Sequence, residues 1–146
     1  MKMIANGFIT DLPQGWEDRS MITLVGPTGS SGFAANVVVT REHITAPTNI
    51  EDYAKEQGEA MAAEIPGVEV LDERAITLHG APAFQRLQRF VLEGQHIQQA
   101  QTFVLGEGGI FVITCSASVV DFDKNILAFR HIVETFRLFK PEAVAI

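Results

Sequence analysis

The sequence predicts an α+β protein whose mainly antiparallel sheet is covered by one helix after the third strand and by one C-terminal helix. Runs of β-branched and aromatic residues follow one another through tight turns, which is typical of antiparallel strands and not of repeated strand–helix–strand units. Only two segments, residues 50–65 and 122–136, repeat apolar residues at helical spacing. A chain of 146 residues fits one domain, residues 1–146.

The N-terminal part is expected to contain three short strands. The first includes Phe8 and Ile9 and ends at the turn-forming residues 12–15. Residues 20–25 and 33–41 form the next two strands. The glycine-rich segment between these two strands lacks the Lys-Ser/Thr pair of a phosphate-binding loop and leads into a strand, so we interpret it as a hairpin connection.

The first helix is predicted to begin at a capping box formed by Thr48 and Glu51 and to end at Pro66-Gly67. One face of this helix bears a stripe made of Ile50, Tyr53, Ala54, Gln57, Met61 and Ile65. Gln57 is the polar exception in that stripe. Burying its amide without a partner would cost about 1–3 kcal/mol. The pattern therefore predicts either an internal partner or a groove in which a ligand supplies one.

Four further strands are predicted in the second half, at residues 68–78, 82–92, 97–105 and 110–115. Turns are expected at His79-Gly80, at Glu93-Gly94 and within residues 106–109. Asp121 is predicted to cap the last helix. The apolar face of that helix contains Phe122, Ile126, Phe129, Val133 and Phe136.

Residues 85–101 are unusually rich in glutamine, with Gln85, Gln88, Gln95, Gln98, Gln99 and Gln101. Pairing across the Glu93-Gly94 turn would place Ile97, Gln99, Gln101 and Phe103 on the same face as Phe84, Arg86, Gln88 and Phe90. A carboxamide both donates and accepts hydrogen bonds without adding a charge. These glutamines line either a solvated face or a ligand-binding groove, and the strand pattern leaves both interpretations open.

Composition argues against several function classes. Eleven basic and eighteen acidic residues give a net charge of −7, which disfavours nucleic acid or anionic lipid as the main partner. The single cysteine, Cys115, excludes an internal disulfide and is expected to be buried. No catalytic or metal-binding spacing is present, so we predict no enzyme activity, no cofactor and no metal. Neither an export signal nor a membrane span is recognisable, which favours a cytoplasmic protein.

Several short motifs resemble the DcrB-related family. The first is Leu-Pro-x-Gly-Trp-x-Asp-x-Ser at residues 12–20, followed by Thr40-Arg41-Glu42. The others are Asp52-Tyr53, Gln57, Ile65-Pro66-Gly67, His79-Gly80, and Gln101 with Phe103. Within that family the chain is similar to the Eag (effector-associated gene) chaperones of bacterial type VI secretion. The resemblance covers nearly the whole chain.

The resemblance implies a PsbP-like α/β/α sandwich and a homodimer. It also implies a chaperone that binds the hydrophobic N-terminal transmembrane segment of a secreted PAAR- or Rhs-type effector before export. The client-binding residues that it implies are Gln57, Gln101, Met21, Val38, Met61, Ile65, Ile97 and Ile113. Thr23 departs from the pattern, because the family has an aliphatic residue there. The alternative is a general protein-binding or assembly module that has no transmembrane client.

Overall fold

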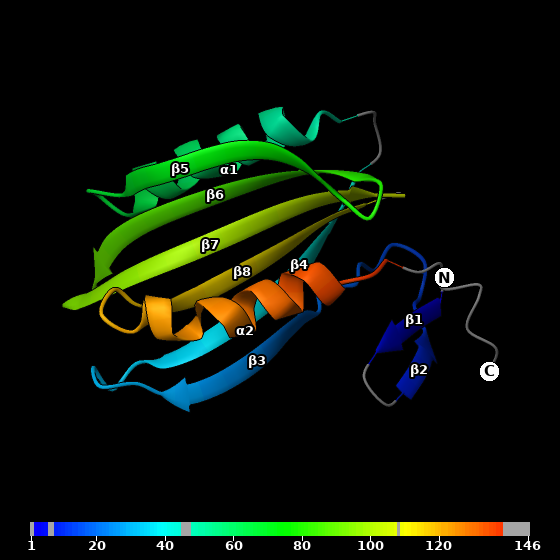
Figure 1. The fold of residues 1–146 in the computed structure, drawn as a ribbon. Coiled ribbons are helices and arrows are strands. Elements are labelled where there is room, and N and C mark those ends of the chain that lie inside the picture. Colours follow the sequence, from blue (N-terminus) through cyan, green and yellow to red (C-terminus); the bar gives the residue numbers. More distant parts are fainter. Residues whose placement is uncertain (1, 6–7, 45–47, 108, 139–146) are drawn as a thin grey trace.

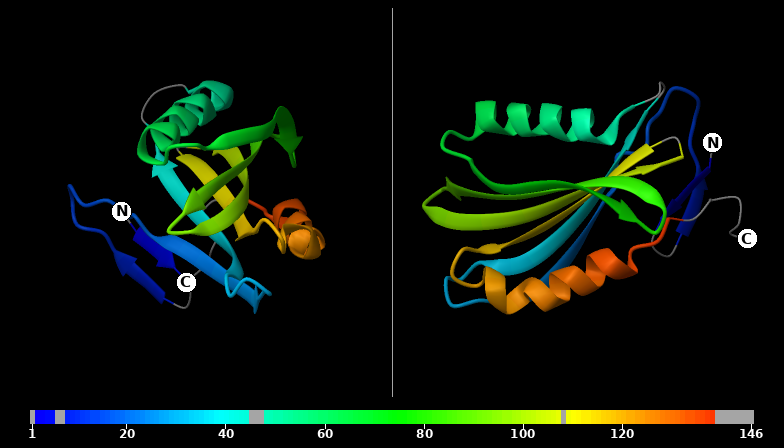
Figure 2. Two further views of the ribbon diagram at one scale, coloured as in Figure 1. Left: turned by 90° about the vertical axis from the view of Figure 1, so that its left-hand side faces the viewer. Right: turned by 45° about the horizontal axis from the view of Figure 1, so that its top comes forward.

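The computed structural model describes residues 2–5, 8–44, 48–107 and 109–138 (Figure 1). Six antiparallel strands form the main sheet in the order β3-β4-β8-β7-β6-β5. Helix α1 (Ile50–Glu64) covers one face and helix α2 (Phe122–Thr135) covers the other, as the two views of Figure 2 show. The predicted α+β sandwich is confirmed.

The main sheet is made of two antiparallel units. A hairpin contains β3 (Met21–Thr28) and β4 (Ala34–His43). A meander follows α1 and contains β5 (Glu69–Leu78), β6 (Ala81–Leu92), β7 (Gln95–Gly106) and β8 (Gly109–Ser118). Strand β8 pairs with β4 and joins the two units. The two edge strands are therefore β3 and β5.

The N-terminus contains a strand that the sequence did not predict. Strand β1 (Lys2–Ala5) pairs with β2 (Phe8–Asp11) in a separate two-stranded sheet. Consequently α1 follows the fourth strand of the chain and not the third. Four residues are too few to show an alternating pattern, so this strand is recognisable only from its pairing with β2.

The cap of α1 differs by one residue from the prediction. The side-chain oxygen of Asn49 accepts hydrogen bonds from the backbone nitrogens of Glu51, at 2.9 Å, and Asp52, at 3.1 Å. Asn49, and not Thr48, is therefore the N-cap residue, and asparagine is among the best residues for that position. The predicted end of the helix before Pro66-Gly67 is confirmed, since α1 stops at Glu64.

The turn between β6 and β7 sets which side chains share a face. Glu93 and Gly94 have φ values of 52° and 78°, as a two-residue hairpin turn with positive φ at both positions requires. The resulting register pairs Arg86 with Gln101 and Gln88 with Gln99. The predicted common face of the two strands is confirmed.

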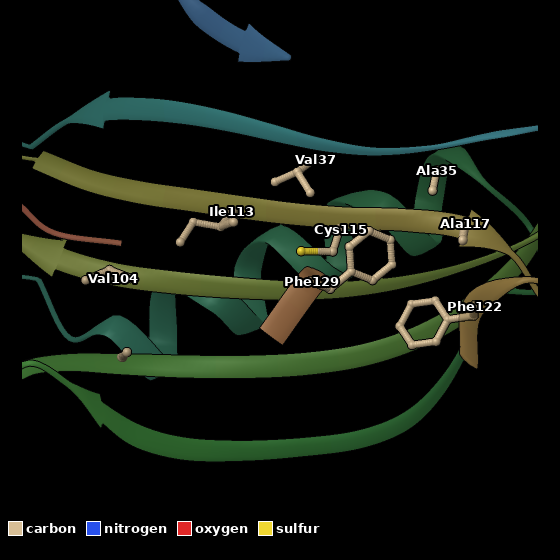
Figure 3. Packing of buried hydrophobic residues seen from close by; sticks show 9 residues of the cluster. Ala35, Val37, Val104, Ile113, Cys115, Ala117, Phe122 and Phe129 are labelled. Atoms are coloured by element: carbon tan, nitrogen blue, oxygen red, sulfur yellow. The ribbon is translucent and has the colours of Figure 1, made fainter. Parts of the chain in front are cut away.

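The larger hydrophobic core lies between the sheet and α2 (Figure 3). Its buried members are Ala35, Val37, Ala83, Val104, Ile113, Cys115, Ala117, Phe122 and Phe129. Burial raises the pKa of Cys115 to about 12, so this thiol is protonated at neutral pH. A smaller cluster under α1 contains Ile50, Ala54, Phe84, Phe103 and Ile110.

Asp121 connects α2 to the β3–β4 loop. Its carboxylate accepts hydrogen bonds from the hydroxyls of Ser118, at 2.9 Å, and Ser30, at 3.0 Å. These bonds, the one from Ser118 first, lower the pKa of Asp121. Asp121 occupies the predicted N-cap position, but its side chain makes no capping hydrogen bond with the helix. The serines hold the carboxylate instead.

Candidate functional site: a pocket between helix α1 and the sheet

A pocket of about 750 Å³ lies between α1 and the sheet. Residues from α1, β4, β7 and β8, and from the segment that precedes β3, line it. They are Glu17, Asp18, Arg19, Ser20, Thr40, Arg41, Glu42, His43, Tyr53, Gln57, Ala60, Met61, Glu64, Gln101, Phe103, Val112 and Thr114. Gln57 and Gln101, which come from opposite walls, thus share one pocket.

One face of α1 forms the upper wall. Tyr53, Gln57 and Met61 follow one another at four-residue spacing and therefore project from the same side of the helix. Only Ile50 and Ala54 of this helix are buried. Gln57 is exposed, so the expectation that its amide is buried in an apolar stripe is wrong. Among the described residues its amide has no hydrogen-bond partner, and both of its polar groups remain accessible to a ligand.

The floor of the pocket is uncharged. It contains Gln101 and Phe103 of β7 and Val112 and Thr114 of β8. Gln101 lies opposite Thr114 in the sheet, and Phe103 lies opposite Val112. A ligand on this floor meets apolar surface together with one amide and one hydroxyl, and it meets no formal charge.

A buried glutamine orients Gln101. Gln88 is only 1% exposed, and its Nε2 lies 3.3 Å from the Oε1 of Gln101, 3.2 Å from the Oε1 of Gln99 and 3.1 Å from the sulfur of Met61. Because Gln101 accepts through its oxygen, its own NH₂ group is left without a partner among the described residues. The sequence placed Gln88 on this face but did not distinguish it from the other glutamines.

Arg86 holds α1 at a fixed height above the sheet. The side chain is 3% exposed, and its Nη2 donates to the backbone oxygen of Ala54 at 2.6 Å. Its guanidinium carbon also lies 5.5 Å from the ring centroid of Phe103. The sequence places Arg86 on a strand face with glutamines and phenylalanines, which is an unusual position for an arginine. Its role could not be inferred from that pattern, because it depends on the position of α1 above the sheet. Arg86 is a positioning residue of the pocket wall.

The rim of the pocket bears charges, in contrast to its floor. Arg19 forms an ion pair with Glu17 at 2.9 Å. Hydrogen bonds from the side chain and backbone of Ser20 lower the pKa of Asp18. The hydroxyl of Tyr53 donates to the carboxylate of Glu42, and burial together with this contact raises the pKa of Tyr53. The tyrosine is therefore a protonated donor at neutral pH.

Five of the eight predicted client-binding residues come from helix α1 or from the sheet face that it covers. Gln57, Gln101 and Met61 line the pocket. Val38 on β4 and Met21 on β3 lie on the same face of the sheet but outside the pocket lining. Met21 is 63% exposed. These five residues lie on one side of the sheet, although the pocket brings together only three of them.

The other three predicted residues are placed differently. Ile65 is half-buried just after α1, and Ile97 is buried on the pocket face of β7 but outside the pocket. Ile113 is 0% exposed and packs in the core on the opposite face, under α2 (Figure 3). Its neighbours Val112 and Thr114 face the pocket instead. A shift of one residue along a strand exchanges the two faces, which is why the structure separates Ile113 from the pocket.

The described residues contain no group of three or more histidine, cysteine, aspartate or glutamate side chains placed to hold a metal ion. Within the same ranges, neither helix is long and apolar enough to cross a membrane.

Fold and site together define a class of structure: a two-helix α+β sandwich with an uncharged, amide-containing pocket floor. The chain belongs to the DcrB family, whose profile matches residues 10–135. It is also similar to the Pseudomonas aeruginosa protein Effector EagT6, with 21% identity over 125 residues, covering 86% of this chain and 87% of that protein. The resemblance inferred from the short motifs is confirmed.

Solved structures show the same fold. A P. aeruginosa protein of unknown function, PA94, has a TM-score of 0.86 at 18% identity and covers 96% of this chain and 97% of its own. Cyanobacterial PsbP (CyanoP) from Synechocystis has a TM-score of 0.59 at 14% identity and covers 90% and 85%. LpqN from Mycobacterium tuberculosis has a TM-score of 0.56 at 17% identity and covers 84% and 85%. The expected PsbP-like fold is therefore confirmed.

Proposed function

We propose that this protein is a non-enzymatic chaperone that binds and shields the hydrophobic transmembrane segment of a type VI secretion effector in the cytoplasm before export. The observation that best supports this role is the meeting of Gln57, Gln101 and Met61 in one pocket. Similarity to a protein named Effector EagT6 supports an effector as the partner.

The chemistry of the pocket suits such a client. A membrane span of about 20 apolar residues cannot remain soluble when exposed. Where glycine or serine allows close approach, its backbone carbonyls and hydroxyls need neutral hydrogen-bonding partners. Gln57 and the NH₂ group of Gln101 can supply them without bringing a charge into an apolar contact.

The pocket would hold only part of the client. A helix of 20 residues is about 30 Å long, whereas the pocket volume is about 750 Å³. Met21 and Val38, on the same face of the sheet, would extend the contact beyond the pocket. The net charge of −7 would also reduce non-specific attraction to anionic membranes.

Co-expression with an N-terminal effector fragment that contains its transmembrane segment tests the proposal. We expect the fragment to stay soluble with the wild-type protein. The Gln57→Leu/Gln101→Leu variant should lose most of this effect, because each lost hydrogen bond is worth about 0.5–1.5 kcal/mol. Gln95→Leu, an exposed glutamine at the far end of β7, is the matched control and should behave as wild type.

Circular dichroism must first show that each variant is folded. A folded double variant that protects the fragment as well as wild type would remove the role of the two amides. A fragment that stays insoluble with the wild-type protein would contradict a transmembrane client. That result would favour a general binding module.

A further inference from the structure

A network of neutral side chains adjoins the pocket floor. Gln88 of β6, Gln99 of β7 and Ser116 of β8 come from three neighbouring strands (Figure 1). The Nε2 of Gln99 donates to the hydroxyl oxygen of Ser116 at 3.0 Å, and its Oε1 accepts from Gln88. The network reaches the pocket at Gln101 and Met61, which line it and both accept from Gln88.

Gln88 faces more acceptors than it has hydrogens to donate. A carboxamide nitrogen has two hydrogens. Three acceptors nevertheless lie within 3.3 Å of the Nε2 of Gln88, namely the sulfur of Met61 and the side-chain oxygens of Gln99 and Gln101. Since Gln88 is only 1% exposed, these neighbours and not bulk water surround its amide. Gln88 is therefore the common donor that turns all three acceptors toward itself.

Most of this network could run in either direction. A carboxamide that turns over exchanges its oxygen and its NH₂ group, and a serine hydroxyl can donate as well as accept. If Gln88, Gln99 and Gln101 all turned over, each amide–amide bond would reverse and Gln101 would present its oxygen to the pocket. Met61 opposes the reversal, because a thioether sulfur accepts but has no hydrogen to donate. In the reversed network, lone pairs of this sulfur and of the Gln88 oxygen would face each other at 3.1 Å.

We infer that Gln88 and Met61 fix the hydrogen-bonding direction of Gln101, so that the pocket floor presents an NH₂ donor and selects a partner that offers an acceptor. The sulfur of Met61 favours the nitrogen of Gln88, and this nitrogen holds the oxygen of Gln101 at 3.3 Å. The NH₂ group of Gln101 remains for the ligand. Gln88 does not line the pocket, so it is a positioning residue, whereas Met61 both lines the wall and sets the direction.

This direction suits a helical client, a consequence that rests on the proposed function. In an α-helix each interior backbone N–H uses its single hydrogen on the carbonyl four residues earlier, whereas each carbonyl oxygen keeps a second lone pair. The backbone of a helix therefore offers acceptors but no free donors. A Gln101 oxygen in the pocket would meet these carbonyl oxygens without a hydrogen between them. The pocket would thus select an apolar helix through a carbonyl beside a small residue, with no polar side chain needed at that place.

Exchange of side-chain amide hydrogens with water, measured by NMR on the protein without client, tests the direction of the network. We expect the NH₂ group of Gln101 to exchange rapidly. The NH₂ group of Gln88 should be protected from exchange and should show a nuclear Overhauser effect to the methyl group of Met61. A protected Gln101 NH₂ group would overturn the inference, and so would a Gln88 NH₂ group with no such effect to Met61.

The variant Met61→Leu tests the role of the sulfur. Leucine keeps an apolar side chain of similar volume, but it accepts no hydrogen bond. If both directions become equally populated, exchange at Gln101 should slow about twofold, because only half of the molecules present the donor to water. Met21→Leu, which is 63% exposed on the same sheet face outside the pocket lining, is the matched control and should leave this rate unchanged. An unchanged rate in folded Met61→Leu would overturn the inference.

The same measurement on a complex separates this inference from the proposed function. In a soluble complex with the co-expressed effector fragment, the NH₂ group of Gln101 should become protected from exchange. A soluble complex in which Gln101 still exchanges as in the free protein would overturn the selection of an acceptor. A fragment that stays insoluble would contradict only the proposed function, because the direction of the network is measured without client.

Discussion

Gly58 lies where α1 crosses the buried guanidinium of Arg86. A Cβ atom at this position would be 2.9 Å from both the Cζ and the Nη2 of Arg86. The guanidinium has little freedom to move, because it is 3% exposed and donates to Ala54 at 2.6 Å. The substitution Gly58→Ala therefore introduces a close contact beneath the helix.

Two effects of opposite sign act in this substitution. Replacing glycine by alanine inside a helix stabilises by about 1 kcal/mol. Displacing the guanidinium weakens a charge-assisted hydrogen bond worth about 1.5–3 kcal/mol. We expect the second effect to dominate, so Gly58→Ala should lower the free energy of unfolding by roughly 0.5–2 kcal/mol.

Introducing Gly58→Ala into an Arg86→Met protein separates the two effects. Arg86→Met keeps an unbranched side chain in place and also removes Nη1, which is buried without a hydrogen-bond partner. The substitution also removes the ion pair between Nη2 and Glu73 at 3.4 Å, and replacing a buried ion-paired charge by an apolar side chain of similar size is often close to neutral. In this background Gly58→Ala should stabilise by about 1 kcal/mol, because only the helix propensity remains.

Urea unfolding of the wild type, both single variants and the double variant measures the coupling. We expect an interaction free energy of roughly 2 kcal/mol between the two positions. If Gly58→Ala stabilises the wild type and the Arg86→Met protein equally, Arg86 does not restrain α1 in the way described.

Three further predictions concern residues outside the pocket. Asn49→Ala should lower the free energy of unfolding by about 0.5–2 kcal/mol through loss of the α1 cap, as denaturant melts would show, whereas unchanged stability would contradict the capping role. Ile113→Ala should cost about 2–5 kcal/mol because the side chain is 0% exposed, yet leave client binding by the folded protein unchanged. Asp121→Asn should be less stable than wild type at neutral pH. Since folding lowers the pKa of Asp121 from 3.8, the stabilisation is present above that value and is lost as the pH falls through the folded value, so thermal melts should converge in acid. A difference in melting temperature between Asp121→Asn and wild type that persists in acid would contradict the carboxylate's role.

Much of the pocket floor was predictable from local chemistry. The turn at Glu93-Gly94 fixes the register of β6 and β7, and this register places Gln88, Gln101 and Phe103 on one face. The position of Ile113 was not predictable in the same way. The face of β8 depends on a register set through its glycine-containing turn with β7, and an offset of one residue reverses every side chain.

The sequence by itself determined both helices, every strand except β1 and most of the turns of this protein, because backbone propensity and turn geometry act between near neighbours. Only the tertiary structure decided which side chains of these elements are buried and which are exposed. It left Gln57 exposed in a pocket, buried Arg86 under α1, and placed β3 at an edge of the main sheet. Burial depends on which distant elements pack together, and no local pattern specifies that partner.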